Sequence, residues 1–365
     1  GVFRGLIQVN DDITQAITIA MLVMLPYILN LRASPHGLIT DTSSRWRKLL
    51  EGWVMADSKG IAYKDGRYIP IEESFIHIMD PAFTKGDVVY DVVTVWDDNF
   101  FRLDDHLERF HSSCDYVRLS PPCTDDEIRH VLAQCVDRAG FSRAMVWMLC
   151  TRGPFSGGTA FGDPRFCENQ FMAYSVPYFW IVPKERSETG AHIWIAETRR
   201  APDVAINQRA KNYNRMDLTA AQFEALDAGA DNPVLISTAG FITEGPGNNV
   251  WIIKNRTAFT PGENILEGVT RRTVFELCEE IGLKAETADL TPADLKNADE
   301  VFISTSGGGI VPVTRVSDQP IGNGAPGLTS CRLRDLYWEK RALGWHTTSV
   351  SELLAVPSDK IASAG

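Results

Sequence analysis

The chain has 365 residues, of which 44% are hydrophobic and 23% are charged, and its formal net charge is -11. This length is sufficient for one large domain or two medium ones with hydrophobic cores. The negative charge and the lack of a lysine- and arginine-rich block argue against a nucleic-acid-binding surface. The seven cysteines form no C-x-x-C pair and the seven histidines form no H-x-H or H-x-x-x-H pair, so we expect reduced thiols, a cytoplasmic location and no metal site.

Residues 1–54 differ in character from the rest of the chain. The segment from Ile13 to Leu31 carries no charge, which leaves three interpretations open: a membrane span, a secretory signal, or an appended or mis-started segment. Pro26 interrupts the apolar run, and two aspartates stand directly before it, where a secretory signal is basic. We favour the third interpretation, because M-A-D-S-K at Met55 resembles a natural start. We therefore treat residues 1–54 as an unmatched extension and do not expect membrane association.

The segment 55–178 predicts a small N-terminal domain with an antiparallel sheet and two helices. Asp65-Gly66 between alternating apolar residues is typical of a hairpin turn. Acidic residues in the first turn after Asp104, and a capping box from Thr124 to Glu127, indicate two helix starts. The expected elements are a hairpin over Ile61–Ile71, strands over Val88–Trp96, Phe100–Leu103, Arg143–Thr151 and Phe171–Val182, a helix from Asp104, and a second helix ending at Gly140.

A connection over 179–186 is expected to lead into a large C-terminal domain over 187–349, followed by a tail over 350–365. Gly229 and Gly282 follow predicted helices as C-terminal caps, and Thr291-Pro292 is typical of a helix start. The expected strands are His192–Ala196, a three-strand meander over Asn232–Ser237, Phe241–Gly245 and Asn249–Asn255, then Glu300–Ser304 and Val311–Val316. The expected helices are Asp217–Ala228, Thr270–Ile281, one after Thr291, and Thr329–Leu343. The fold class predicted is α/β (α+β).

The polar residues that stand out are weak signals when each is taken alone. Most lysines in loops, such as Lys211, are merely solvated, and E-G-P-G from Glu244 is no phosphate-binding fingerprint. The three glycines at 307–309 mark a plain turn. Arg109 most simply pairs with Asp105 at i,i+4 on a solvated helix face. The order and spacing of these residues carry more information than any one of them.

A pyridoxal phosphate cofactor needs three kinds of group. It needs a lysine that forms a Schiff base with its aldehyde, an acid that holds its pyridinium proton, and backbone N–H groups for its phosphate. Lys211, Glu244 and the helix start at Thr270 match these needs. The distances along the chain are 33 residues from Lys211 to Glu244, 26 from Glu244 to Thr270, and 36 from Thr270 to Ser306.

With these motifs the chain resembles the class IV aminotransferases, the fold type IV pyridoxal-phosphate enzymes. That family includes branched-chain, D-amino-acid and (R)-selective amine transaminases. The resemblance rests on E-G-P-G-N-N from Glu244, G-V-T-R from Gly268, Y-D-V-V-T-V-W-D from Tyr90, and F-F-R-L-D-D-H-L-E-R-F from Phe100. It covers roughly residues 60–343. The last two stretches look most like the (R)-selective amine transaminase branch.

The resemblance implies a role for each matching residue. Lys211 would form the Schiff base and then carry the proton in the transfer, and Glu244 would face the pyridinium. The residues implied to bind the phosphate are Arg109, Val269, Thr270, Thr305 and Ser306, and Asn249 would brace the hairpin that carries Glu244. The residues expected in the substrate pocket are Tyr90, Lys85, Val92, Arg165 and Arg215.

The departures from the family pattern lie around the substrate. Lys85 stands where the (R)-amine branch usually has histidine, and Arg215 where it has tryptophan. The family's carboxylate-binding arginine aligns near Gly158, so Arg165 could take its place. Pro246 is a further departure, because proline removes a backbone donor from the turn.

The resemblance therefore implies two α/β domains with the cofactor between them, a homodimer, and ping-pong transfer of an amino group. The donor would be an (R)-amine or a D-configured compound, and the acceptor a keto acid such as pyruvate. A branched-chain or D-amino-acid aminotransferase, or a lyase on the same fold, is the alternative. A catalytically inactive homologue that binds pyridoxal phosphate is a further one.

Overall fold

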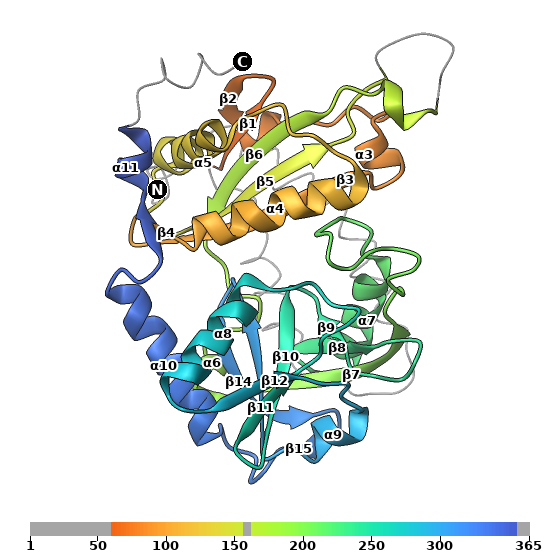
Figure 1. The fold of residues 1–365 in the computed structure, drawn as a ribbon, viewed down its shortest axis with the longest axis vertical. Coiled ribbons are helices and arrows are strands. Elements are labelled where there is room, and N and C mark those ends of the chain that lie inside the picture. The colour runs from red at the N-terminus through yellow and green to blue at the C-terminus, as the bar shows by residue number, and fades with distance from the viewer. Residues whose placement is uncertain (1–59, 156–161, 356–365) are drawn as a thin grey trace, which may run out of the picture. The chain divides into compact units, whose positions relative to one another are not determined.

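The computed structural model describes residues 60–155 and 162–355. The predictions for residues 1–54, including the apolar segment from Ile13 to Leu31, lie outside these ranges, as does the position of Gly158. In the described ranges, two sheets and their helices account for most of the chain (Figure 1). No helix in these ranges is long and apolar enough to cross a membrane.

The first sheet has seven strands in the order β16-β4-β3-β5-β6-β1-β2, and every neighbouring pair is antiparallel. The strands are β1 (Ile61–Lys64), β2 (Arg67–Pro70), β3 (Val88–Trp96), β4 (Asn99–Phe101), β5 (Ala144–Thr151), β6 (Gln170–Pro177) and β16 (Thr347–Ser349). The predicted hairpin is confirmed: Asp65 and Gly66 have φ of 51° and 73°, as a type I′ turn requires. The predicted strand Phe171–Val182 stops at Pro177.

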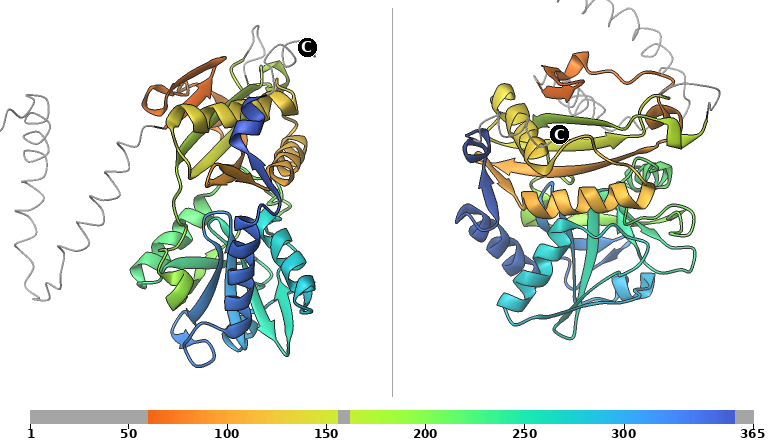
Figure 2. Two further views of the ribbon diagram at one scale, coloured as in Figure 1. Left: turned by 90° about the vertical axis from the view of Figure 1, so that its left-hand side faces the viewer. Right: turned by 45° about the horizontal axis from the view of Figure 1, so that its top comes forward.

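Two helices, α4 (Leu103–Val117) and α5 (Asp125–Ala139), pack on one face of this sheet. The capping box at Thr124 is confirmed, with both of its hydrogen bonds formed. Apolar side chains of both helices, such as Phe110 and Leu132, are buried against Val93 and its neighbours. An antiparallel sheet with two helices, as predicted for this half, is therefore what the structure contains, and Figure 2 shows it from two further sides.

The alternation of side chains along β3 decides what the site can use from this strand. Val89, Asp91 and Val93 belong to the face covered by the helices, whereas Tyr90 and Val92 lie on the opposite face. One strand therefore supplies a carboxylate to α4 and an aromatic hydroxyl to the other side.

The second sheet has the order β12-β11-β10-β13-β14-β7-β8, with β15 paired to β14 and β9 to β10. Its strands are β7 (Ala191–Arg199), β8 (Asn232–Ile236), β9 (Glu244–Gly245), β10 (Asn248–Lys254), β11 (Thr257–Thr260), β12 (Lys284–Thr287), β13 (Glu300–Thr305), β14 (Gly309–Val316) and β15 (Gln319–Pro320). The predicted three-strand meander is formed over short stretches: Ile236 of β8 makes an antiparallel bridge with Ile242, and β9 pairs antiparallel with β10. β8 pairs in parallel with β7, and β10 pairs with β11 and β13. All five residues of β8 are buried, which suits a strand covered on both faces rather than one in a surface hairpin.

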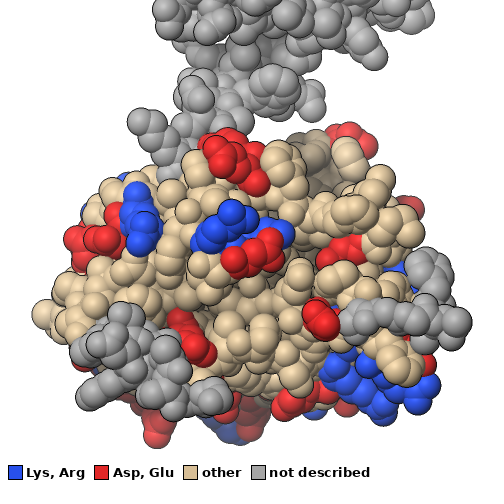
Figure 3. Space-filling model, turned by 90° about the horizontal axis from the view of Figure 1, so that it is seen from above, with Lys and Arg blue, Asp and Glu red and all other residues tan. Residues whose placement is uncertain are grey.

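The larger helices of this part are α7 (Met216–Asp227), α8 (Val269–Glu280) and α10 (Leu328–Ala342). The shorter ones in the described ranges are η2 (Ile71–Glu73), α3 (Pro81–Thr84), η3 (Pro164–Phe166), α6 (Arg186–Thr189), α9 (Pro292–Lys296) and α11 (Val350–Leu354). Helix α8 begins at Val269 with Gly268 as its N-cap, one residue before the predicted start. On the face drawn in Figure 3, acidic and basic groups are interspersed and no broad patch of one sign appears.

Candidate active site

Lys211 lies in the segment between β7 and α7, and this segment is attached to an edge of β3. Strand β4 pairs only with Val95 and Trp96, which leaves the first half of β3 open on that side. There the Tyr90 N–H donates to the Lys211 carbonyl at 2.9 Å. The Lys211 N–H in turn donates to the Ser113 hydroxyl of α4 at 3.1 Å. The Lys211 backbone is therefore held by β3 and by α4, the helix that packs on the first sheet.

The Lys211 amine is half-buried, and its Nζ lies 4.6 Å from the centroid of the Tyr90 ring. Burial lowers the pKa of Lys211, and the positive charges of Arg109 and Arg215 lower it further, against opposing effects of Tyr90 and Asp91. A lowered pKa increases the fraction of neutral amine, which is the form that attacks a carbonyl or accepts a proton. The environment therefore suits a nucleophile and base.

Arg109 does not form the predicted pair with Asp105, which binds Arg102 and Arg272 instead. Arg109 is bound to Asp91: its Nε donates to Oδ2 at 2.7 Å and its Nη2 to Oδ1 at 2.8 Å. The simple i,i+4 prediction failed because α4 buries this face against β3, where the strand presents a carboxylate. A fixed bidentate pair of this kind sets the plane of the guanidinium.

His106 completes this buried cluster, with its Nδ1 2.7 Å from Asp91 Oδ1. Burial alone would raise the pKa of Asp91, but the charges of Arg109 and His106 and their hydrogen bonds hold it well below its usual value. Burial lowers the pKa of His106 despite Asp91. The cluster is therefore an ionised Asp91 that is bound by Arg109 and His106.

The pair with Asp91 leaves a defined part of Arg109 available. Of the five N–H donors of a guanidinium, Nε and one of Nη2 are bound to Asp91, and an Nη1 donor points to the Glu267 carbonyl at 3.3 Å. Nη2 also lies 3.4 Å from His106 Nδ1. The N–H donors of Nη1 and Nη2 that these groups do not use remain for an anion such as a phosphate group.

Glu244 is buried on β9 and has a partner for each oxygen. Its Oε1 accepts from Arg200 Nη2 at 2.9 Å, and its Oε2 accepts from the Leu266 N–H at 2.9 Å. Arg200 also binds Asp217 at 2.7 Å, so one guanidinium joins two carboxylates. A carboxylate oxygen accepts more than one hydrogen bond, which leaves Glu244 able to take a further N–H from a ligand.

The start of α8 is shaped for an anion. Its N-cap, Gly268, has no side chain that would occupy the first N–H groups, which belong to Val269 and Thr270. A Cβ on Gly268 would lie 2.1 Å from Asn249 Oδ1, so a side chain there would displace Asn249. Asn249 Nδ2 donates to the Leu266 carbonyl at 2.9 Å and so holds the segment that precedes α8.

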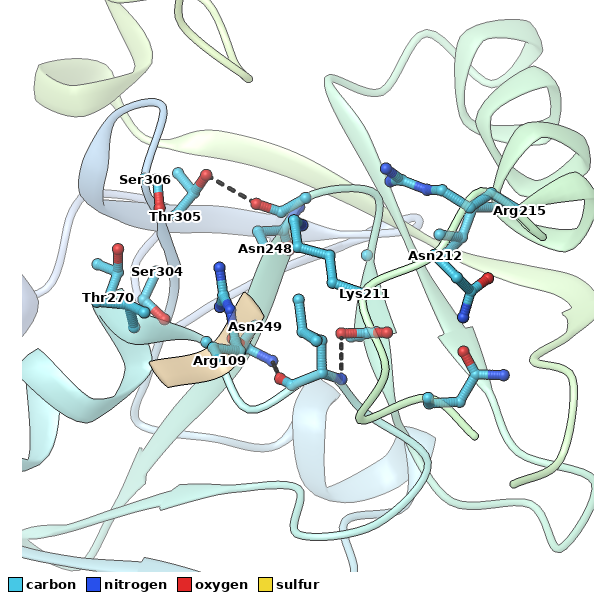
Figure 4. Close-up of a pocket in the computed structure, with 18 of the residues that line it drawn as sticks. Arg109, Lys211, Asn212, Arg215, Asn248, Asn249, Thr270, Ser304, Thr305 and Ser306 are labelled. Carbon is cyan, nitrogen blue, oxygen red and sulfur yellow. Dashed lines mark hydrogen bonds between the residues drawn. The ribbon is translucent and has the colours of Figure 1, made fainter. Parts of the chain in front are cut away.

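The loop after β13 adjoins this helix start. The Thr305 hydroxyl donates to the Gly247 carbonyl at 2.7 Å and accepts from the Gly307 N–H at 3.2 Å, so it is engaged within the protein. Thr270, Ser304 and Ser306 lie together on one side of the site, with Lys211 between them and Arg215 (Figure 4).

Two adjoining hollows share Tyr90, Arg109, Lys211 and Arg215. The larger has a volume of about 530 Å³. Among the described residues that line the smaller hollow, the basic side chains are Arg109, Arg200, Lys211 and Arg215, and the acidic side chain is Glu244. This excess of positive charge favours anionic ligands.

Three of the five predicted substrate-pocket residues, Tyr90, Val92 and Arg215, line the larger hollow. The other two lie elsewhere. Lys85 lies 6.0 Å from the Phe155 ring and lines a separate hollow. Arg165 is bound to Asp163, and 83% of its side chain is exposed. Neither residue therefore lines the larger hollow, contrary to the expectation from the sequence. Arg165 is held away by Asp163, two residues earlier in the same turn, which binds its guanidinium.

The sequence alone did not identify several residues of the site. Asp91, His106 and Arg200 are buried polar groups whose partners are distant along the chain. An aromatic wall, consisting of Trp147, Tyr174 and Phe179, also lines the larger hollow. Alternation along β5 and β6 could have placed the first two on the face of Tyr90.

The chain has the sequence signature of a known family: residues 88–316 match the model for amino-transferase class IV. D-alanine aminotransferase of Bacillus licheniformis is 31% identical over 265 residues, which are 72% of this chain and 90% of that protein. Branched-chain-amino-acid aminotransferase of Pseudomonas aeruginosa is 24% identical over 78% of this chain and 94% of its own. The solved structure of branched-chain amino acid aminotransferase from Thermobaculum terrenum in its PLP-form has 25% identity and a TM-score of 0.70, covering 80% of this chain and 98% of that one.

The residues present fit pyridoxal phosphate. Glu244 is a buried carboxylate with a free acceptor position, the N-terminus of α8 is kept open by Gly268, and Arg109 keeps N–H donors that Asp91 does not use. The reactive amine of Lys211 lines the same hollow. From the family match and this donor set, we conclude that the chain belongs to the class IV aminotransferases, with pyridoxal phosphate as its cofactor.

Proposed function

We propose that this enzyme transfers an amino group from an (R)-amine or a D-configured donor to a keto acid such as pyruvate, by a ping-pong reaction. The observation that carries the proposal is the half-buried Lys211 amine, whose pKa is lowered, in a hollow lined by Arg109 and Glu244. When bound, pyridoxal phosphate supplies the carbonyl that takes the amino group and the ring that withdraws electrons.

Residues of the chain hold the cofactor and move the proton. Lys211 Nζ would hold the cofactor between turnovers, and as a free amine it would accept the proton from the donor carbon and later give it back. Glu244 would accept the N–H of the ring nitrogen, and Arg200 binds that carboxylate and fixes its position. Arg109, the N–H groups of Val269 and Thr270, and Ser306 hold the phosphate.

The configuration of the donor is supported by sequence. The stretches from Tyr90 and from Phe100 look most like the (R)-selective amine transaminase branch, and a D-alanine aminotransferase is among the similar proteins. The branched-chain relatives support the alternative, a branched-chain aminotransferase.

The aromatic wall supports a donor with a bulky apolar group. The rings of Trp147 and Tyr174 are stacked with centroids 4.9 Å apart and planes at 11°, and Phe179 continues the stack at 6.0 Å from Trp147. These rings line the larger hollow. Flat aromatic surfaces favour an aryl or large alkyl group against them.

Lys211→Ala tests the proposed function. The variant should lose both the visible absorbance of the bound cofactor and turnover, whereas Lys254→Ala, at an exposed lysine bound to Asp299, should keep both. Wild-type protein should convert (R)-1-phenylethylamine or D-alanine with pyruvate faster than L-leucine with 2-oxoglutarate. Turnover retained by Lys211→Ala would refute the role of the lysine, and a preference for L-leucine would favour the branched-chain alternative.

The proposal includes a homodimer. Several apolar side chains between the end of β2 and the end of α3, namely Phe75, Ile78, Met79 and Phe83, expose more than half of their surface. Such groups are common at interfaces between subunits. Sedimentation of the full chain at micromolar concentration should give the mass of two chains; the mass of one chain would contradict this part of the proposal.

A further inference from the structure

We propose that Arg215, together with the hydroxyl of Tyr90, binds the carboxylate of an amino-acid or keto-acid substrate. This inference rests on the proposed function and adds to it the group that recognises one end of the substrate. It concerns a position where the family pattern quoted above has a different residue.

The first observation is where the Arg215 side chain lies. Arg215 is the N-cap residue of α7, where its side chain has no acceptor for the helix N–H groups. Its guanidinium instead reaches the hollow that contains Lys211, where Nη1 donates to the Tyr90 hydroxyl. Figure 4 shows it on the opposite side of Lys211 from Thr270, Ser304 and Ser306. The reactive amine therefore lies between a phosphate-binding side and a second cationic side.

The second observation is the charge balance of the three arginines that line the site. Arg109 is paired with Asp91, and Arg200 is paired with both Glu244 and Asp217. Among the residues that the structure describes, Arg215 has no ion pair with a carboxylate, and those lining the larger hollow include no aspartate or glutamate. A partly buried charge without a counter-ion is costly, so this arrangement favours an anion brought by a ligand.

The third observation is the direction of the donors. The Tyr90 oxygen accepts from Arg215, so the proton of that hydroxyl is available to another acceptor. Tyr213 stacks on Tyr90 with centroids 4.2 Å apart and planes at 18°, which fixes the ring. Arg215 retains further N–H donors on its fork. A hydroxyl and a guanidinium that meet in this way suit the two oxygens of one carboxylate.

The other basic candidates do not meet these conditions. Arg165 is exposed and bound to Asp163, and Lys85 lines a different hollow. Lys211 and Arg109 belong to the cofactor. Within the described ranges, Arg215 is therefore the basic residue of the larger hollow that remains for the substrate.

The test compares Arg215→Gln with Arg165→Gln, an exposed arginine outside the site, in protein loaded with pyridoxal phosphate. The probe is 4-methylvalerate, a carboxylate without an amino group, whose Kd is measured by calorimetry and by the shift of the cofactor absorbance. Loss of a charge-assisted contact should weaken binding roughly 10- to 150-fold in Arg215→Gln. Arg165→Gln should bind the probe like the wild type.

Kinetics add a second readout. The KM for pyruvate should rise at least about tenfold in Arg215→Gln, and the loss of kcat/KM for D-alanine should exceed that for (R)-1-phenylethylamine, which has no carboxylate. Tyr90→Phe, which removes only the hydroxyl, should show a smaller increase of the same Kd. Equal Kd and KM values in Arg215→Gln and Arg165→Gln would overturn the proposal.

Two further outcomes separate this inference from the proposed function. If wild-type protein lacks turnover, the proposed function fails, but calorimetry with 4-methylvalerate still tests Arg215. If Arg215→Gln unfolds, Arg215→Lys keeps the charge without the planar fork. Arg215→Lys should then bind the probe at least several-fold more weakly than wild type, and unchanged binding would count against bidentate recognition.

Discussion

The pair of Asp91 and Arg109 gives the sharpest quantitative prediction, because both groups are nearly or fully buried. The Asp91 side chain is 0% exposed and that of Arg109 is 12% exposed. Asparagine at position 91 keeps one acceptor but replaces the other oxygen by an N–H₂ group that faces an arginine donor. Removing one partner of a buried ion pair costs about 3–5 kcal/mol. Asp91→Asn should therefore lower the free energy of unfolding by about 3 kcal/mol, at the low end of that range.

The dependence of this loss on pH has a definite sign. The pKa of Asp91 is held below its usual value of about 3.9, so its contribution is fully present above that pH and is lost only as the pH falls through the folded-state value. Asp91 also affects the pKa of the adjacent His106, which is lowered, so the comparison is made above the range in which His106 titrates. The difference between wild type and variant should be the same at pH 8 and pH 7, and a difference that shrinks toward pH 7 would mean that the folded carboxyl binds a proton well above its usual pKa.

Urea unfolding of the cofactor-free protein measures the stability, and fluorescence titration with pyridoxal phosphate measures its Kd. Arg109 loses the group that orients its fork, so the Kd should rise about tenfold or more, which corresponds to about 1.4 kcal/mol. Asp97→Asn is the matched control, since Asp97 is 64% exposed and pairs with Arg143 in the turn after β3. It should cost less than about 1 kcal/mol and leave the Kd unchanged. Equal effects of the two substitutions would refute the reasoning.

Three further predictions follow from the cofactor site. Gly268→Ala should displace Asn249 and lower the free energy of unfolding by about 1–3 kcal/mol, measured by urea unfolding. Gly262→Ala, whose Cβ would lie 3.3 Å from its nearest neighbour, should lower the free energy of unfolding by less. Arg200→Lys keeps the charge but cannot hold two carboxylates with one fork, so cofactor titration should show weaker binding; an unchanged Kd would contradict this. Because the pKa of Lys211 is lowered, covalent binding of pyridoxal phosphate to the cofactor-free protein should rise with pH to a midpoint below about 10.4, and a midpoint at that value would refute the lowered pKa.

Features that depend only on residues close together in the sequence were predictable. The hairpin at Asp65-Gly66 and the capping box at Thr124 depend on the φ preferences of a few residues and on side chains three residues apart. The order of Lys211, Glu244 and Thr270 was predictable for a different reason, since a shared cofactor constrains their spacing. In both cases the information lies in a short list of positions.

Contacts between distant segments were not predictable in the same way. Arg109 had an acidic neighbour at i,i+4, and nothing in the local sequence indicates that Asp91 on another element would replace it. The parallel pairing of β8 with β7 was missed because alternating apolar residues specify a strand but not its partner. Arg165 was misplaced because sequence distance from a motif says little about direction. Each of these errors concerns which surfaces meet, a property of the whole fold.

The three arginines of the site show how one residue type can serve a permanent and an exchanging ligand. Arg109 and Arg200 are fixed by carboxylates of the protein, so their geometry is set before the cofactor arrives and little order is lost on binding. Arg215 is held by a neutral hydroxyl instead. In the proposed ping-pong reaction the first product leaves before the second substrate enters, so the residue that binds the substrate carboxylate has to bind an anion and release it in every cycle. A protein carboxylate at Arg215 would compete with that anion, whereas Tyr90 orients the guanidinium without neutralising it.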